Sequence, residues 1–293
     1  MLKFLFWGLI FHQSLYAQEI SFTWLGTTGS YITDGKTGLL FDPVVTRPSL
    51  TQVMFYRPIS SDQKLVQEWI DKIQMKNVSA VFISHSHYDH AFDAAAFTKT
   101  LGATLYGTKT TYYIGKGGDV PEEKLKVIQA EEVYTVGAFK VTVLPSDHTP
   151  LIGSYQAFPG ELKEPLRQPA PASAYVMGGA FGFYIEHAKG NIFFLPMSTR
   201  SEKLHFNERH ADVVLQGIAS RKSTKDLLKE LSLPAKPKTI IPLHFDDFSY
   251  PLAEGFRALF SVDPDEFVST TKKLYPELQV TVPKHGEKII LYR

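Results

Sequence analysis

The sequence predicts an α/β domain in which two β-sheets pack together and helices cover their outer faces. Three observations support this fold class. Both halves of the chain show short apolar runs, typical of buried strands, followed by segments with helical spacing. Turn signals between several of these runs favour hairpins. The 293 residues are 44% hydrophobic and 21% charged, which is ordinary for a globular protein.

The first half begins with strands and continues with helices and strands in alternation. Strands are expected at residues 21–25, 30–33 and 39–41, and the glycine-containing turn at 34–38 favours a hairpin between the last two. Apolar residues between 60 and 75 recur at helical spacing and predict a helix packed on the sheet. A buried strand at 78–83, a helix near 91–100 and a short strand at 103–106 complete this half.

The middle of the chain combines a hairpin with a long irregular segment. Apolar and polar residues alternate over 132–144 around Gly137, and this predicted hairpin ends just before His148. Residues 149–174 are rich in proline and aromatic residues and show no clear period. Long loops in compact domains are uncommon and often functional, so we expect a lid or pocket wall here. The alternative is a purely structural excursion.

The C-terminal half repeats the pattern of strands followed by helices. A hairpin is expected from 179–186 and 191–196, a buried strand at 212–217 and a short helix at 224–231. The strand at 239–243 ends at His244. A helix over 263–274 has Pro264 and acidic residues in its first turn, both favourable there. Final strands are predicted at 279–282 and 288–291.

The most informative motif is the run His85-Ser86-His87-Tyr88-Asp89-His90, directly after the strand at 78–83. Neutral imidazole is a common ligand for borderline metals, and a carboxylate adds a hard anionic ligand. Four such groups on a short turn can diverge towards two adjacent ions. A helix face cannot do this, since its same-face spacing is three or four residues.

Two further histidines, His148 and His244, also stand just beyond predicted strands. The other four histidines after residue 18 occupy turns or polar stretches, and we expect solvent-exposed imidazoles at all four: His187, His205, His210 and His285.

The His-x-His-x-Asp-His spacing in its strand-to-helix context resembles the signature of the metallo-β-lactamase fold superfamily, over roughly residues 19–293. The resemblance implies a four-layer αββα sandwich of two mixed β-sheets with outer helices. It also implies two metal sites, the first held by His85, His87 and His148 and the second by Asp89, His90 and His244. Asp89 would act catalytically by orienting the bridging water and moving a proton to the leaving group.

One position departs from the family pattern. The family usually carries a carboxylate that bridges both metals in the turn after the hairpin around 191–196, and here Ser198 stands in that place. A neutral hydroxyl is a poor ligand, so a weaker second site is expected, and a redox di-iron centre is disfavoured. We predict that Ser198→Asp tightens binding of the second metal.

Several residues near the ligands are candidates for supporting roles. Ligating imidazoles usually donate their second N–H to a carboxylate or carbonyl, and Asp42, which ends a strand, is a candidate acceptor together with Asp147, Asp246 and Asp247. For each aspartate the alternative is a turn-forming role. Tyr88 and Thr149 flank ligands and are expected to touch substrate, and Ser198 is a candidate for either role.

The function implied by the resemblance is a metal-dependent hydrolase, in which a metal-bound hydroxide attacks a lactone, phosphodiester or related ester-like bond. The residues at 39–43 and 241–247 look more like the lactonase and phospholipase-D-like branch than like true β-lactamases. A true metallo-β-lactamase and a non-catalytic metal-binding protein stay open as alternatives. One or two divalent ions are expected, with Zn²⁺ favoured by the histidine-rich, thiol-free ligand set.

Composition and the N-terminus bound the partners and the location. The net charge of +1 gives no electrostatic case for nucleic acid. The resemblance implies a small-molecule or lipid-like substrate. Lys3, the apolar run at 4–11 and Ala17 before Gln18 predict a signal peptide over 1–17 and an exported protein, periplasmic or secreted. Residues 18–293 are then expected to form a single domain. The alternative is that the N-terminal apolar run is itself the first buried element of the domain. The apolar run is too short to span a bilayer, and the chain has no cysteine.

Overall fold

The computed structural model describes residues 19–150 and 156–293, and within these ranges the chain forms two seven-stranded sheets that face each other. The first sheet has the order β14 (Lys288–Tyr292), β1 (Ile20–Gly26), β2 (Gly29–Thr33), β3 (Gly38–Phe41), β4 (Val78–Phe82), β5 (Thr104–Gly107) and β6 (Leu125–Val127). The second has the order β13 (Gln279–Val280), β12 (Thr239–Leu243), β11 (Val213–Gly217), β10 (Ile192–Leu195), β9 (Ala180–Glu186), β8 (Phe139–Ser146) and β7 (Val133–Val136).

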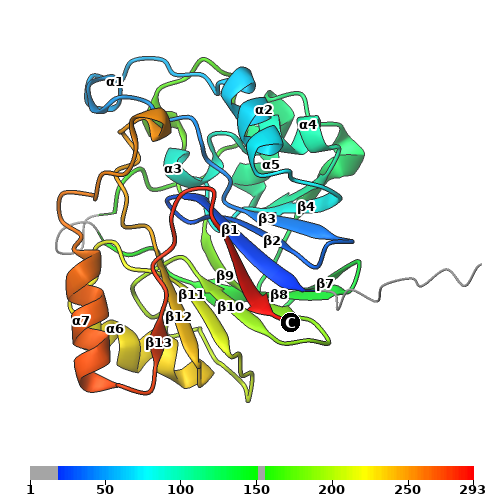
Figure 1. Ribbon diagram of the computed structural model, residues 1–293. Helices are drawn as coiled ribbons and strands as arrows, with labels where there is room; N and C mark the ends of the chain where they lie inside the picture. The colour runs from blue at the N-terminus through cyan, green and yellow to red at the C-terminus, as the bar shows by residue number, and fades with distance from the viewer. Residues whose placement is uncertain (1–18, 151–155) are drawn as a thin grey trace, which may run out of the picture.

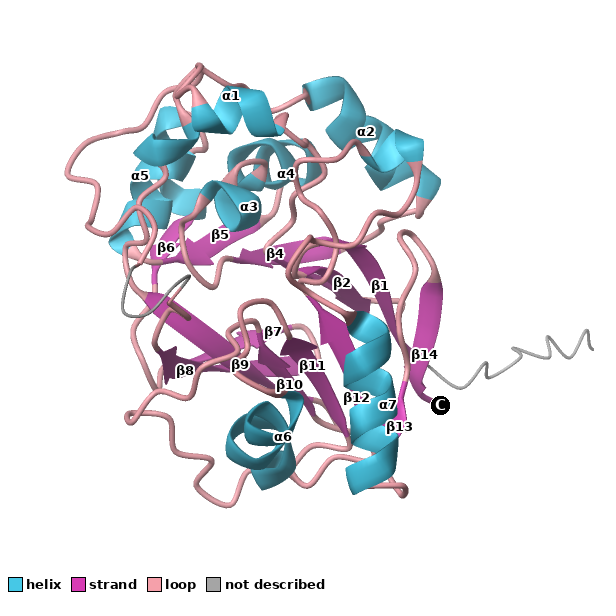
Figure 2. Cartoon of the chain, turned by 90° about the vertical axis from the view of Figure 1, so that its left-hand side faces the viewer, coloured by secondary structure: helices cyan, strands magenta, loops and turns pink. Residues whose placement is uncertain are grey.

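Both sheets are mixed, and helices cover their outer faces (Figures 1 and 2). Pairs β3–β4, β4–β5 and β5–β6 are parallel, as are β10–β11, β11–β12 and β12–β13, whereas the remaining neighbours are antiparallel. Helices α2 (Gln63–Lys72), α4 (Ala94–Leu101) and α5 (Lys109–Gly117) lie over the first sheet, and α6 (Thr224–Leu227) and α7 (Pro264–Leu274) lie over the second. The predicted four-layer sandwich is confirmed.

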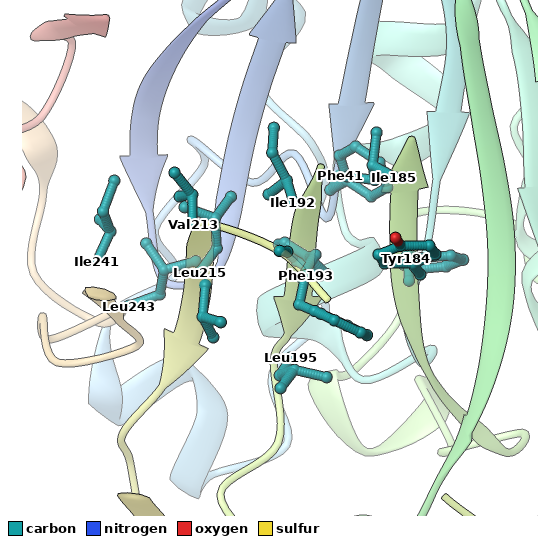
Figure 3. Packing of buried hydrophobic residues seen from close by; sticks show 14 of the residues in the cluster. Phe41, Tyr184, Ile185, Ile192, Phe193, Leu195, Val213, Leu215, Ile241 and Leu243 are labelled. Atoms are coloured by element: carbon teal, nitrogen blue, oxygen red, sulfur yellow. The ribbon is translucent and has the colours of Figure 1, made fainter. Parts of the chain in front are cut away.

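The alternation of side chains along the strands builds two apolar layers. In β3 and β4, Phe41 and Phe82 point between the sheets, while Leu40 and Val81 point towards the helices. Figure 3 shows residues of β10 and β11 in the inter-sheet core, among them Ile192 and Leu215. The ring centroids of Phe41 and Phe194 lie 5.0 Å apart, so aromatic contacts join the two sheets.

Among the α-helices and strands of the described ranges, α1 (Leu50–Met54), α5 and β6 were not predicted from the sequence. The short helix α3 (Tyr88–Ala91) also begins earlier than the helix expected near 91–100. No helix in the described ranges is long and apolar enough to cross a membrane. The predicted signal peptide at 1–17 lies outside the described residues.

The two sheets place four strand ends at one edge of the sandwich. β3 and β4 are parallel neighbours, so Asp42 and the run from His85 to His90 follow the same edge of the first sheet. In the second sheet β8 and β12 point the same way, because two antiparallel pairings and two parallel pairings separate them, and His148 and His244 follow their ends.

Candidate metal centre

The loop between β4 and α3 carries the histidine-rich run. Hydrogen bonds hold this loop: Ser86 N–H donates to Met177 O at 3.0 Å, and His90 N–H donates to His87 O at 3.0 Å. His87 is the N-cap residue of α3 with extended backbone, so Asp89 and His90 lie on the helix turn that follows it. The chain therefore reverses between His85 and His90, and the four side chains can approach a common space.

Six side chains meet at this edge in two groups of three. One group contains His85, His87 and His148, and the other contains Asp89, His90 and His244, with the donor atoms in each group within 4.8 Å of one another. His85 Nε2 lies 3.1 Å from His87 Nδ1. Asp89 Oδ2 lies 3.3 Å from His244 Nε2 and 3.5 Å from His90 Nε2. The structure thus brings together all six residues predicted as ligands.

This donor set fits divalent cations. Imidazole nitrogen and carboxylate oxygen are the ligands that zinc accepts in proteins, and each group supplies three of them, which leaves coordination open. His148 Nδ1 and His244 Nδ1 are buried and have no hydrogen-bond partner among the described residues. Buried polar atoms are usually satisfied, and such exceptions occur where an ion or ordered water completes the site.

Burial and mutual repulsion favour the neutral form in the first group. Burial, followed by the neighbouring histidines, lowers the pKa of His85 well below its ordinary value. Burial and His87 lower the pKa of His148 to about 4. Imidazole binds metal only in its neutral form, so these shifts suit ligation.

In the second group the carboxylate and imidazole support each other. Burial raises the pKa of Asp89, but the charge of His90 and a hydrogen bond from His244 outweigh it, and the pKa lies well below its usual range. Burial lowers the pKa of His90, but the carboxylates of Asp89 and Asp42 reverse the effect and raise it. Asp89 is therefore present as a carboxylate.

Asp42 fixes the orientation of His90. A carboxylate only accepts hydrogen bonds, so His90 Nδ1–H donates to Asp42 Oδ2 at 2.9 Å, and Nε2 is left to face the second donor group. Thr28 Oγ1 donates to the same oxygen at 2.9 Å, and the Ser84 N–H and hydroxyl donate to Asp42 at 2.7 and 2.6 Å. Asp42 is fully buried. It accepts the second N–H of a candidate ligand, which is the arrangement that histidine ligands commonly have.

The other three candidate aspartates do not contact a ligand side chain through a hydrogen bond. Asp147 is exposed. Asp247 accepts from Ser249 and Arg257. Asp246 is linked to His244 only through Thr27. It accepts a hydrogen bond from the Thr27 backbone N–H at 2.7 Å, and the Thr27 carbonyl accepts one from the His244 backbone N–H at 2.7 Å.

Asp246 belongs to a cluster that the sequence did not reveal. It pairs with Arg47 at 2.7 Å and with His285 at 3.0 Å, and the His285 ring stacks on Trp24 at 4.3 Å. The expectation that His285 is exposed is therefore wrong. It is also wrong for His187, whose side chain is 5% exposed and lies 3.5 Å from Asp34, whereas His205 and His210 are exposed as expected.

Ser198, Thr149 and Tyr88 all line the cavity beside the ligands. The Ser198 hydroxyl donates to the Ala219 carbonyl at 2.6 Å, and its N–H donates to Thr149 Oγ1 at 3.0 Å. These bonds hold the residue next to His148. Burial, followed by the nearby carboxylates, raises the pKa of Tyr88, so its phenol is neutral.

The cavity has a volume of about 400 Å³, and all six candidate ligands are among its lining residues. Ala157 and Phe158, from the described part of the 149–174 segment, line it. Tyr175, which follows that segment, is fully buried in the core between the first sheet and the helices. Sequence reasoning did not find Thr28, Met54 or Phe248 near the site, because no motif marks them.

Comparison with known proteins agrees with this geometry. The sequence model of the metallo-beta-lactamase superfamily matches residues 22–179. A protein of Polynucleobacter asymbioticus, named a metal-dependent hydrolase, is 26% identical over 251 residues, which cover 81% of this chain and 77% of that protein.

Solved structures share the fold at low identity. A protein of Veillonella parvula, described as a possible metal-dependent hydrolase, superposes with a TM-score of 0.60 at 18% identity and covers 93% of this chain and 100% of its own. Igni18, a metallo hydrolase from Ignicoccus hospitalis, superposes with a TM-score of 0.59 at 15% identity, over 94% of this chain and 99% of its own.

Proposed function

This chain belongs to the metallo-beta-lactamase superfamily and is a metal-dependent hydrolase of it, and we propose that it cleaves an ester-like bond at a dinuclear zinc centre. One observation carries the proposal: two complete sets of three donors line a single cavity. A binding protein that had lost catalysis would be expected to show damage in such a set.

We assign His85, His87 and His148 to the first ion and Asp89, His90 and His244 to the second. Zinc is favoured because the chain has no cysteine and the donors are mostly imidazoles. When bound, the ions lower the pKa of coordinated water towards 7 and polarise the oxygen of the scissile group.

The chain's own residues then hold the reactants and move the proton. The Asp89 carboxylate lies between His90 and His244, where it would accept a proton from the attacking water and pass it to the leaving group. Asp42 keeps His90 Nδ1 protonated and its Nε2 available. The neutral Tyr88 phenol lines the same cavity and is placed to contact the substrate.

The test is hydrolysis of a lactone, a thioester, a phosphodiester and a β-lactam, each with and without a chelator. We expect chelator-sensitive turnover of at least one class other than the β-lactam. Asp89→Asn should abolish it, and His205→Ala, at an exposed histidine outside the site, should leave it unchanged. Turnover of the β-lactam alone would identify a true β-lactamase. No turnover with metal bound would favour the non-catalytic alternative.

We also propose that residues 1–17 form a cleaved signal peptide and that the enzyme is exported. The basic Lys3, the apolar run at 4–11 and Ala17 before the cut support this. N-terminal sequencing of protein from the periplasmic and extracellular fractions should begin at Gln18. A cytoplasmic protein that retains Met1 would refute the assignment.

A further inference from the structure

The walls of the cavity carry almost no charge. Among its described lining residues there is no lysine or arginine, and the one acid is Asp89, which belongs to the candidate metal centre. The proposed ions would compensate a negative charge on the group that reacts. A negative charge elsewhere on the substrate would meet no lysine or arginine among the described lining residues. The lining therefore favours an uncharged arm beyond the reacting group, since a buried charge is costly unless a partner compensates it.

One side of the cavity is an exposed apolar segment. No residue of α1 is buried, yet Val53 and Met54 of α1 and Tyr56 just after it line the cavity. Met54 is 61% exposed and Tyr56 is 64% exposed. Phe248 and Leu259 also line the cavity, from the segment that follows His244. Large exposed apolar groups gathered at one place mark binding sites in soluble proteins.

We propose that the substrate is an ester, thioester or lactone with an uncharged, apolar arm, and that the arm lies against α1, Phe248 and Leu259. The proposal rests on the proposed function and narrows its substrate class. The arm is the chosen occupant because the apolar wall is continuous with the cavity that holds the six candidate ligands. Binding the arm would cover Met54 and Tyr56, which the folded chain leaves in water.

The first test measures binding and does not require turnover. Linear alkyl hydroxamic acids with two to ten carbons are titrated by calorimetry into the zinc-loaded protein. Affinity should rise about fourfold for each added methylene, which corresponds to the transfer free energy of a buried CH₂ group. The rise should stop when the arm outgrows the cavity. Affinity that is independent of chain length, or no binding by any member, would overturn the proposal.

The second test changes the wall without touching the core. Met54→Lys and Met54→Glu both replace an exposed residue of α1, a helix with no buried residue. Both variants should therefore keep the fold, which circular dichroism checks. Both variants should flatten the dependence on chain length. A hydroxamic acid of the same length that carries a carboxylate at the end of its arm should bind the wild type more weakly than the alkyl compound, and equal or tighter binding would refute an uncharged arm.

Phe55→Lys is the matched control. Phe55 is 67% exposed beside Met54 but does not line the cavity, so this variant should keep the wild-type dependence. An equal effect of Phe55→Lys would show that the whole surface of α1 binds the ligand, and would overturn the assignment to the cavity wall.

Failure of the proposed function would look different. If no ester, thioester or lactone is hydrolysed but hydroxamate affinity rises with chain length, the apolar site stands and the hydrolytic assignment fails. If short and long esters are hydrolysed with the same kcat/KM and hydroxamate affinity is flat, the hydrolase stands and the apolar arm is refuted.

Discussion

Asp42→Asn should weaken the second metal site by a mechanism that can be followed atom by atom. Asp42 has a left-handed backbone with φ of 44°, which asparagine also tolerates, so the substitution should not disturb the chain path. If the amide oxygen keeps the bond from Ser84 N–H, the new NH₂ group replaces the oxygen that accepts from His90 Nδ1–H.

Two donors would then face each other. The hydroxyls of Thr28 and Ser84 can rotate and accept, but His90 can relieve the conflict only by moving its proton from Nδ1 to Nε2. A protonated Nε2 cannot bind a metal. Loss of such a supporting carboxylate typically costs about 10- to 100-fold in metal affinity. That range corresponds to about 1.4–2.8 kcal/mol at the metal.

The assay is competition for zinc against a chromophoric chelator, fitted for two sites. The second dissociation constant should rise 10- to 100-fold in Asp42→Asn, on the scale expected for a lost outer carboxylate. The first should change little. Asp147→Asn is the matched control, because Asp147 directly precedes the candidate ligand His148 but is exposed. Unchanged zinc affinity in a folded Asp42→Asn protein would refute the role given to this carboxylate.

Three further predictions test the surroundings of the site. Gly217→Ala should lower the free energy of unfolding in urea by about 1–3 kcal/mol, because the added Cβ would lie 1.9 Å from a backbone oxygen of the turn after β10. An unchanged unfolding midpoint would contradict this packing. Ser198→Asp should tighten the proposed second metal site in the same competition assay, because it adds an anionic ligand where the family usually carries a carboxylate. The carboxylate cannot donate to the carbonyl that the serine hydroxyl contacts, so that bond would not hold it away from the ion. Weaker or equal binding would count against the alignment of this turn. Burial raises the pKa of Glu266, but hydrogen bonds from Thr224 and Arg221 hold it below the ordinary 4.5. Glu266→Gln should therefore be less stable than the wild type at neutral pH, with a difference that is lost as the pH falls below about 4.5; a gap that persists in acid would disprove the linkage.

The strand ends and the residues after them could be predicted because the signal is local. An apolar run marks each buried strand, and the polar residues that follow it must lie at the sheet edge. Asp42, His148 and His244 were found in this way. That their side chains converge depends on the pairing of distant strands, which only the resemblance supplied.

The burial of individual histidines could not be predicted in the same way. His285 stands in a turn between lysine and glycine, yet it packs on Trp24 and pairs with Asp246, both far away in the sequence. A residue becomes buried through partners that fold onto it, and no local pattern encodes those partners. The error at His187 has the same cause, since His187 lies in the turn after β9 of the second sheet and its partner Asp34 lies in the turn after β2 of the first.

Helix α5 was missed because its sequence disfavours a helix. It contains Gly115 and Gly117, and glycine costs about 1 kcal/mol relative to alanine in a helix interior. Packing explains the choice: a Cβ at Gly115 would lie 2.6 Å from Leu125 of β6 and 2.8 Å from Leu105 of β5. The helix approaches the sheet closely only because Gly115 has no side chain, so tertiary packing overrides propensity here.

The split of the six donors between the two sheets has a consequence for a chain without cysteine. Such a chain has no covalent means of tying distant segments together. Ions held between residue 89 and residue 244 would close a very long loop, and cross-links over long loops restrict the unfolded chain most strongly. The bound metal would then act as a reversible cross-link between distant segments of the chain. Stripping it would resemble the reduction of a disulfide, since the apolar contacts of the folded state stay the same while the unfolded chain regains its freedom.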